Sequence, residues 1–323
     1  METLRRNAAL LGAVVVLLLS APAVARAQVW LPAKGQGAVS VLFSNTLSKE
    51  HFLPDRRFDF GHIDANTVLL DLTYGVTDRL TVNVGLPIVA ARYRGSFPHR
   101  PVTLDDGAWH TNTQDFRFGV RYNVLDGPVV ITPFAGSSLP SHDYEYFAHA
   151  APGRALNEFV AGVGAGRLFA GLGLVVQGTY AYSVSESALD VPRRFSLASL
   201  ETAYFITPGL RVMAITSSRI GHTGIDLLPN SGAVLPAEVF RHHDQISRES
   251  FLNVGGGIAV SLTDSIELFG GYTTTVTGRN THATNRGVSL GVGWGFGQPG
   301  APATAVAARR QSALVKCLCR KAG

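Results

Sequence analysis

The stretch Arg286–Phe296, RGVSLGVGWGF, decides the fold class of this chain. Its apolar residues occupy every second position, and only serine and glycine separate them. Successive side chains of a β-strand point to opposite faces, so this strand has one apolar, aromatic face and one nearly bare face. Such a strand suits a wall between lipid and a crowded lumen. The pattern predicts a transmembrane β-strand that ends at Phe296.

The aromatic end of this stretch resembles the C-terminal assembly signal of bacterial outer-membrane barrels, whose final strand closes the sheet and ends on Phe. Trp294 and Phe296 are therefore candidate assembly-signal residues, and the barrel assembly machinery is the implied partner. A tail of 27 residues beyond Phe296 departs from that pattern, because such barrels usually end at the closing strand. The tail is basic, contains the only two cysteines, Cys317 and Cys319, and is expected to be disordered.

The N-terminus has the layout of a secretory signal peptide. Arg5 and Arg6 precede an apolar run over residues 8–19, and Ala25-Arg26-Ala27 forms a small-residue cleavage site. The run is too short to cross a bilayer as a helix, and no later segment offers about 20 apolar residues. The expected location is the outer membrane of a Gram-negative bacterium after signal-peptide removal, although export alone also allows a soluble periplasmic protein. The expected organisation is a signal peptide (1–27), a β-barrel (28–296) and the tail (297–323).

Composition supports a barrel over a soluble domain. Hydrophobic residues make up 46% of the chain and charged residues only 16%, with 35 glycines among 323 residues. In a barrel, lipid-facing side chains replace the buried core, and small lumenal residues leave room inside. Without residues 1–27 and the tail, the 28 basic and 23 acidic residues fall to 20 and 22. This balance leaves no basic footprint for a nucleic-acid partner.

Twelve segments alternate between apolar and small or polar residues. They are 37–45, 66–76, 80–89, 115–124, 129–137, 158–166, 174–184, 197–206, 210–217, 251–262, 266–277 and 287–296. We expect an all-β fold, an antiparallel transmembrane β-barrel of about 12 strands.

The connections between these segments alternate in length. Short turns rich in Asp, Gly and Pro join the second segment to the third, the fourth to the fifth, the sixth to the seventh, the eighth to the ninth and the tenth to the eleventh. Long polar loops join the others, at 46–65, 90–114, 138–157, 185–196, 218–250 and 278–286. The arrangement predicts short periplasmic turns, long extracellular loops and, with an even strand count, both termini on the periplasmic side.

Charged and amide residues fall on the parity opposite to the apolar residues, which is the lumenal side. The lumen-lining candidates are Asp71, Asn83, Asp115, Arg117, Arg121, Glu158, Glu201, Arg211 and Glu267. A basic side chain on the lipid face near midplane would cost about 2–4 kcal/mol, which explains the sorting. The mixed signs predict a lumenal ion-pair network, which either guides a solute or braces the wall.

All ten histidines fall in or beside the predicted loops, and His242-His243-Asp244 is the densest local group with metal-binding side chains. No HExxH motif or pair of CxxC motifs is present, so we expect no metal and no cofactor. An enzyme is the rival class, because some outer-membrane barrels hydrolyse lipids with Ser and His at the outer rim. Ser217 and His222 offer both residue types, but no GxSxG elbow accompanies them, so we expect no catalytic residues and no enzyme.

Three stretches resemble an outer-membrane family assigned to the MetA pathway of phenol degradation, whose members are described as transporters or exported proteins. The stretches are Gly61–Pro87 (GHIDANTVLLDLTYGVTDRLTVNVGLP), Gln114–Leu125 (QDFRFGVRYNVL) and Thr132–Ala150 (TPFAGSSLPSHDYEYFAHA). The resemblance implies a barrel that passes small molecules, with aromatic or apolar ones as candidates. We therefore expect a passive, porin-like channel or uptake protein, surrounded by outer-membrane lipid and lipopolysaccharide. The alternatives are a lipid- or envelope-modifying enzyme at the outer rim and a closed structural barrel.

Overall fold

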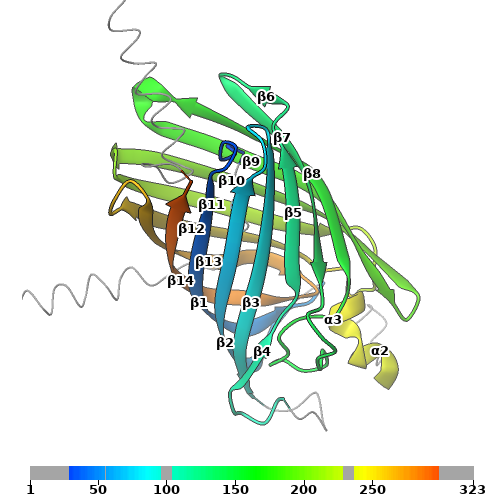
Figure 1. Ribbon diagram of the computed structural model, residues 1–323. Coiled ribbons are helices and arrows are strands. Elements are labelled where there is room, and N and C mark those ends of the chain that lie inside the picture. Colours follow the sequence, from blue (N-terminus) through cyan, green and yellow to red (C-terminus); the bar gives the residue numbers. More distant parts are fainter. Residues whose placement is uncertain (1–28, 55, 96–103, 228–235, 298–323) are drawn as a thin grey trace, which may run out of the picture.

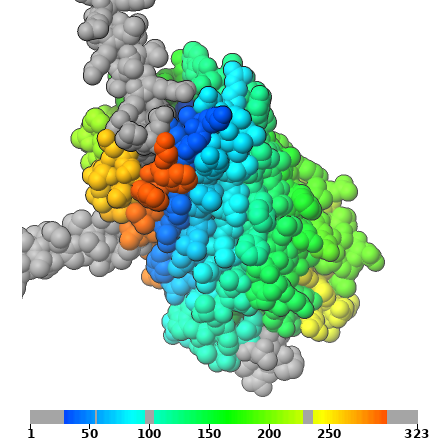
Figure 2. Space-filling view, viewed as in Figure 1, coloured from blue at the N-terminus to red at the C-terminus, as the bar shows by residue number. Residues whose placement is uncertain are grey.

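One closed antiparallel β-barrel accounts for most of the chain in the computed structural model, which describes residues 29–54, 56–95, 104–227 and 236–297 (Figure 1). The last strand pairs with the first in antiparallel register, from Gly37 opposite Phe296 to Phe52 opposite Thr281. Figure 2 shows this closure on the surface, where the orange C-terminal strand lies against the blue N-terminal strand. The predicted signal peptide and the tail cysteines lie outside the described residues.

Fourteen strand segments make up twelve barrel strands. They are β1 (Gly37–Phe52), β2 (Arg57–Gly75), β3 (Leu80–Arg94), β4 (His110–Thr113), β5 (Phe116–Tyr122), β6 (Leu125–Asp126), β7 (Val129–Leu139), β8 (Glu158–Phe169), β9 (Leu174–Ala188), β10 (Val191–Thr207), β11 (Leu210–Gly221), β12 (Ser250–Ser261), β13 (Ile266–Arg279) and β14 (Thr281–Phe296). Segments β4 and β5 both pair with β3 and form one interrupted strand, while β6 pairs with β7 beside the end of β5.

The helices are short and lie at the barrel ends. They are η1 (Ala170–Leu172), α2 (Ala237–Arg241) and α3 (His243–Ile246). Within the described ranges, none of them has the length and apolar character needed to cross a membrane. Helices α2 and α3 belong to the connection between β11 and β12, at the end of the barrel opposite the short turns (Figure 1).

The predicted strand number and order are confirmed, but several strands extend further at the extracellular end than the alternation indicated. The connection between β1 and β2 spans only 53–56, and a single residue, Asn280, separates β13 from β14. Leu189 and Asp190 join β9 to β10 with positive φ at both positions, as a tight hairpin turn requires. Beyond the membrane the alternation disappears, because no lipid selects the outward side chains, while backbone pairing continues.

The outward face carries a belt of exposed apolar side chains. It includes Val41, Phe43, Leu70, Leu72, Val82, Val84, Phe118, Val120, Val163, Tyr180, Leu200, Val212 and Val292. Above this belt, Asn45 donates to Asn66 at 2.9 Å and Arg286 donates to Asn45 at 3.0 Å. Since charged and amide groups avoid the hydrocarbon region, this polar group marks the outer edge of the lipid-facing surface.

A cluster of buried apolar residues lies inside the extracellular end. Phe60, Val89, Ala91, Tyr93 and Ala150 form one cluster, contributed by β2, β3 and the loop after β7. The connection between β11 and β12 also folds inward there. Packing at this end therefore holds the loops in defined positions over the lumen.

Candidate functional site

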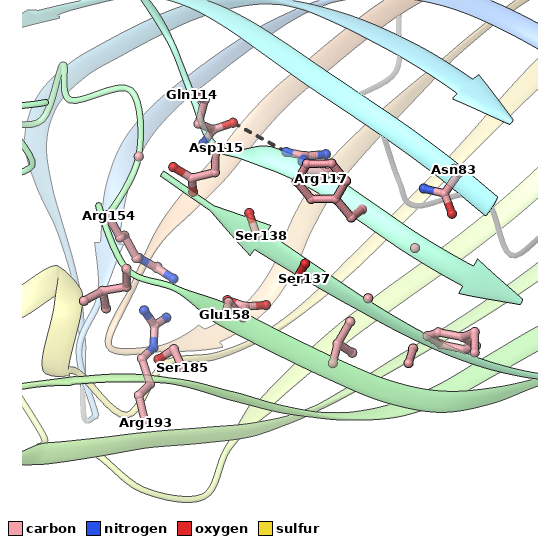
Figure 3. A pocket seen from close by; sticks show the side chains of 18 of the residues that line it. Asn83, Gln114, Asp115, Arg117, Ser137, Ser138, Arg154, Glu158, Ser185 and Arg193 are labelled. Atoms are coloured by element: carbon pink, nitrogen blue, oxygen red, sulfur yellow. Dashed lines mark hydrogen bonds between the residues drawn. The ribbon is translucent and has the colours of Figure 1, made fainter. Parts of the chain in front are cut away.

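A cavity of about 560 Å³ lies in the lumen against β5, β7 and β8, beneath the inward-folded loops (Figure 3). The charged residues that line it are Arg117, Arg121, Arg154, Arg193, Arg219, Asp115 and Glu158. Five guanidinium groups thus share the wall with two carboxylates. Phe134, Leu156 and Val160 add apolar surface to the same wall. The cavity therefore combines a positive field with patches that an uncharged part of a solute can contact.

Glu249 connects three of these arginines at the extracellular side of the cavity. Its Oε2 atom accepts hydrogen bonds from Arg154 at 2.7 Å, Arg193 at 2.9 Å and Arg219 at 2.8 Å. Burial alone would raise the pKa of the Glu249 carboxyl, but the three arginines outweigh burial and lower that pKa below its ordinary value. Glu249 and these three arginines form an ion-pair hub, in which one carboxylate offsets only one of the three guanidinium charges. Glu158 and Asp244 also interact electrostatically with Arg154.

Five of the nine predicted lumen residues lie on the cavity wall: Asn83, Asp115, Arg117, Arg121 and Glu158. Asp71 lies next to them, because cross-strand pairing places it opposite Gly85, which is itself opposite Arg117. Gln114 accepts a hydrogen bond from Arg117 at 3.4 Å (Figure 3). The hydroxyl of Tyr144 donates to the Asp115 carboxylate.

The other three predicted lumen residues lie away from this cavity. Arg211 and Glu267 form a two-pronged ion pair at 2.5 and 2.8 Å, and both side chains are buried. Glu201 accepts a hydrogen bond from Gln177 at 3.1 Å. These contacts join nearby strands of the wall on its lumenal side, β9 with β10 and β11 with β13, so they have the geometry of internal braces.

The residues just before β1 occupy part of the lumen, which the sequence pattern did not reveal. Val29 is 1% exposed, its carbonyl accepts a hydrogen bond from the Thr132 hydroxyl at 2.7 Å, and its amide donates to Gln177 at 3.5 Å. A side chain at Gly164 would collide with Val29. The glycine-rich face of residues 162–166 is the sequence signal that could have indicated that another segment of the chain packs against β8.

Histidines from three parts of the chain meet near the extracellular rim. The rings of His51 and His282 pack at 4.5 Å between centroids, and His149 lies 5.4 Å from His282. His149 also contacts the Asp105 carboxylate at 3.2 Å, with both side chains buried. The expectation that every histidine lies outside the strands is wrong for His51, His62, His110 and His282, because the strands extend beyond the membrane.

The serine and histidine proposed for the rival enzyme are not paired. His222 contacts the hydroxyl of Ser196 at 2.7 Å, and Ser196 also contacts the Tyr180 hydroxyl at 2.8 Å. Ser196 is only 4% exposed, so its oxygen lacks the access that a nucleophile needs.

The two candidate assembly-signal residues lie on the outward face of the closing strand. Trp294 is 54% exposed, and the ring of Phe296 stacks against Tyr74 with 6.5 Å between centroids. These positions place both aromatic rings at the seam between β14, β1 and β2.

Comparison with protein-family models and with curated proteins yields no match to this sequence. Among solved structures, the chain is similar to the COG4313 outer membrane channel from Pseudomonas putida F1, with 15% identity and a TM-score of 0.62. That match covers 82% of this chain and 97% of the channel. The NanC porin aligns with 12% identity over 80% of this chain and 99% of that one, with a TM-score of 0.47. The first similarity shows the fold, that of an outer-membrane β-barrel.

Proposed function

We propose that this protein is a passive outer-membrane channel for small solutes and that its lumenal cavity favours anions. The observation that carries the proposal is the cavity wall, where five arginines outnumber the four carboxylates that line or adjoin it, Asp115, Glu158, Glu249 and Asp71. A narrow passage of low dielectric amplifies such fixed charge. The apolar patches beside the arginines suit anions that carry an aromatic or aliphatic group. No step of this proposal requires chemistry on the solute.

The segment at Val29 narrows the periplasmic part of the lumen in this state. It is held by two hydrogen bonds to lumenal side chains, of which the one to Gln177 is long at 3.5 Å. A solute that leaves the cavity therefore has to pass or displace this segment. We expect low conductance with openings when the segment moves.

We also propose which lipids surround the barrel, which machinery inserts it and where it is located. The outward belt would contact outer-membrane lipid and lipopolysaccharide, and the barrel assembly machinery would recognise the closing strand through Trp294 and Phe296. The bacterial outer membrane is the proposed location after removal of residues 1–27.

Replacing Arg117 and Arg121 together by serine tests the role of the cavity. Both arginines line the cavity from β5, so their loss should shift the reversal potential in a salt gradient toward cations. The matched control is Arg286→Ser, which removes an arginine from the outer face and should leave selectivity unchanged. If the double variant keeps the selectivity of the parent but melts at a lower temperature, these arginines only brace the wall.

A further inference from the structure

Three metal-binding side chains converge at the extracellular rim, outside the cavity described above. His243 and Asp244 belong to α3, and His282 belongs to β14. The Asp244 Oδ1 atom lies 3.5 Å from His243 Nε2 and 3.5 Å from His282 Nε2. One nitrogen or oxygen from each of the three residues lies within 4.8 Å of the other two.

The hydrogen bonding of His243 points to a cation at this position. Its Nδ1 atom lies 2.7 Å from the carbonyl oxygen of Phe240, so Nδ1 carries the proton that this acceptor needs. In the neutral ring, Nε2 then presents a lone pair toward the Asp244 carboxylate. Two lone pairs repel unless a proton or a metal ion lies between them. A backbone carbonyl that fixes the far nitrogen is also the usual support of a metal-binding histidine.

Orphaned ring nitrogens next to this group are a second, independent observation. Among the described residues, no hydrogen-bond partner lies within reach of the buried Nδ1 atoms of His282 and His51. The two rings pack edge to face, 4.5 Å apart. Buried polar atoms are nearly always paired, so protein groups alone leave these two rings incompletely satisfied. In His282 the nitrogen that approaches Asp244 is Nε2, and its orphaned Nδ1 has no acceptor that fixes the ring proton there.

We propose that His243, Asp244 and His282 bind one divalent transition-metal ion, with zinc as the best match. Two imidazoles and one carboxylate are a borderline-soft ligand set, which favours zinc over calcium or magnesium. In a tetrahedral zinc site, ligands about 2.0–2.1 Å from the metal lie roughly 3.4 Å apart. The distances from Asp244 Oδ1 to the Nε2 atoms of His243 and His282 already have nearly this length. A small side-chain rotation brings the two histidine nitrogens to the same separation.

Such an ion would fasten the loop between β11 and β12 to the barrel wall. Helix α3 lies in this loop only a few residues before Glu249, which holds the arginine hub of the cavity. The metal would therefore fix the position of Glu249 and its three arginines from the extracellular rim. This inference does not depend on the proposed transport function.

Zinc titration of the refolded mature protein in detergent tests the site by isothermal calorimetry. Cys317 and Cys319 are replaced by serine in every sample, because their thiolates would also bind zinc. We expect one zinc ion per barrel, and Asp244→Asn and His282→Gln should each weaken binding at least about tenfold. The matched control is His110→Gln. It breaks another histidine–aspartate pair at the extracellular end, His110 with Asp106 at 2.8 Å, and should leave the affinity unchanged.

Folding of each variant is checked by its heat-dependent shift on a gel, and His243→Gln replaces any variant that fails to refold. The absence of zinc binding in the micromolar range would overturn the proposal and assign the contacts to proton-mediated ion pairs. Equal affinities of the His282→Gln and His110→Gln proteins would overturn it as well.

Discussion

At the scale of single residues, Glu249 contacts three arginines, more than any other carboxylate in the described structure. It is the shared acceptor of three arginines, and its side chain is only 8% exposed. Removing the charge of one partner in a buried ion pair typically costs about 3–5 kcal/mol. We expect Glu249→Gln to lower the unfolding free energy by an amount of this order, because the arginines then repel one another without a counter-charge.

The lowered pKa of Glu249 makes the stability of the fold depend on pH. The folded state lowers the pKa of Glu249, so the stabilisation is complete above the unfolded pKa of about 4.3 and is lost as the pH falls toward the folded pKa. Guanidinium unfolding between pH 7 and pH 3 should therefore show a steeper acid loss for the parent than for Glu249→Gln. The control is Glu186→Gln, which alters an exposed contact with Asn157 and should behave like the parent. If Glu249→Gln and the parent lose stability equally steeply as the pH falls, the stabilising role assigned to Glu249 is contradicted.

Parity along the strands was enough to place Arg117 and Arg121 on one lumenal face, since alternation is a local property of the chain. Glu249 and Arg154 could not be paired in this way. They are 95 residues apart, and both lie in connections without periodicity. The contact of His282 with Asp244 could not be predicted for a similar reason. It depends on how far β14 extends and on where the loop before β12 folds.

At the scale of elements, the segment before β1 and the glycine face of β8 fit each other. A Cβ atom at Gly164 would lie 2.7 Å from Val29 Cγ1, while its next neighbours are 3.6 Å away. Gly164→Val should therefore displace the segment without disturbing the wall. We expect higher single-channel conductance in planar bilayers, with an unchanged β-type circular dichroism spectrum.

Gly293→Val is the matched control for this substitution. It adds the same bulk to another strand glycine, where the nearest atom to a Cβ is 3.9 Å away, and it should not raise the conductance. A conductance increase in both variants, or in neither, would show that the segment does not limit flow.

The strands themselves were the most predictable elements. All twelve were expected in the correct order, since lipid on one side imposes strict alternation over residues such as Val82 and Val84. Their extracellular ends were not predicted, because His51 and His282 pair across β1 and β14 where no such selection operates. The position of Val29 inside the barrel also had no periodic signal, as it depends on contacts more than 100 residues away.

At the scale of the whole molecule, closure explains how a chain with few buried apolar residues is stable. Pairing of β1 with β14 leaves no free edge, and the outward belt gains its apolar surroundings from lipid. The interior is then free to hold charged groups, which are braced at Arg211 and Glu267 and gathered around the cavity. The barrel thus combines a lipid-facing exterior with an arginine-rich passage.

The reversal potential of single channels formed by the mature protein tests this account most directly. In a planar bilayer with a gradient of potassium chloride, the five arginines of the cavity wall predict small openings whose reversal potential has the sign of chloride preference. A protein that inserts but passes no current would contradict the channel. Openings that prefer potassium would contradict the role assigned to the cavity.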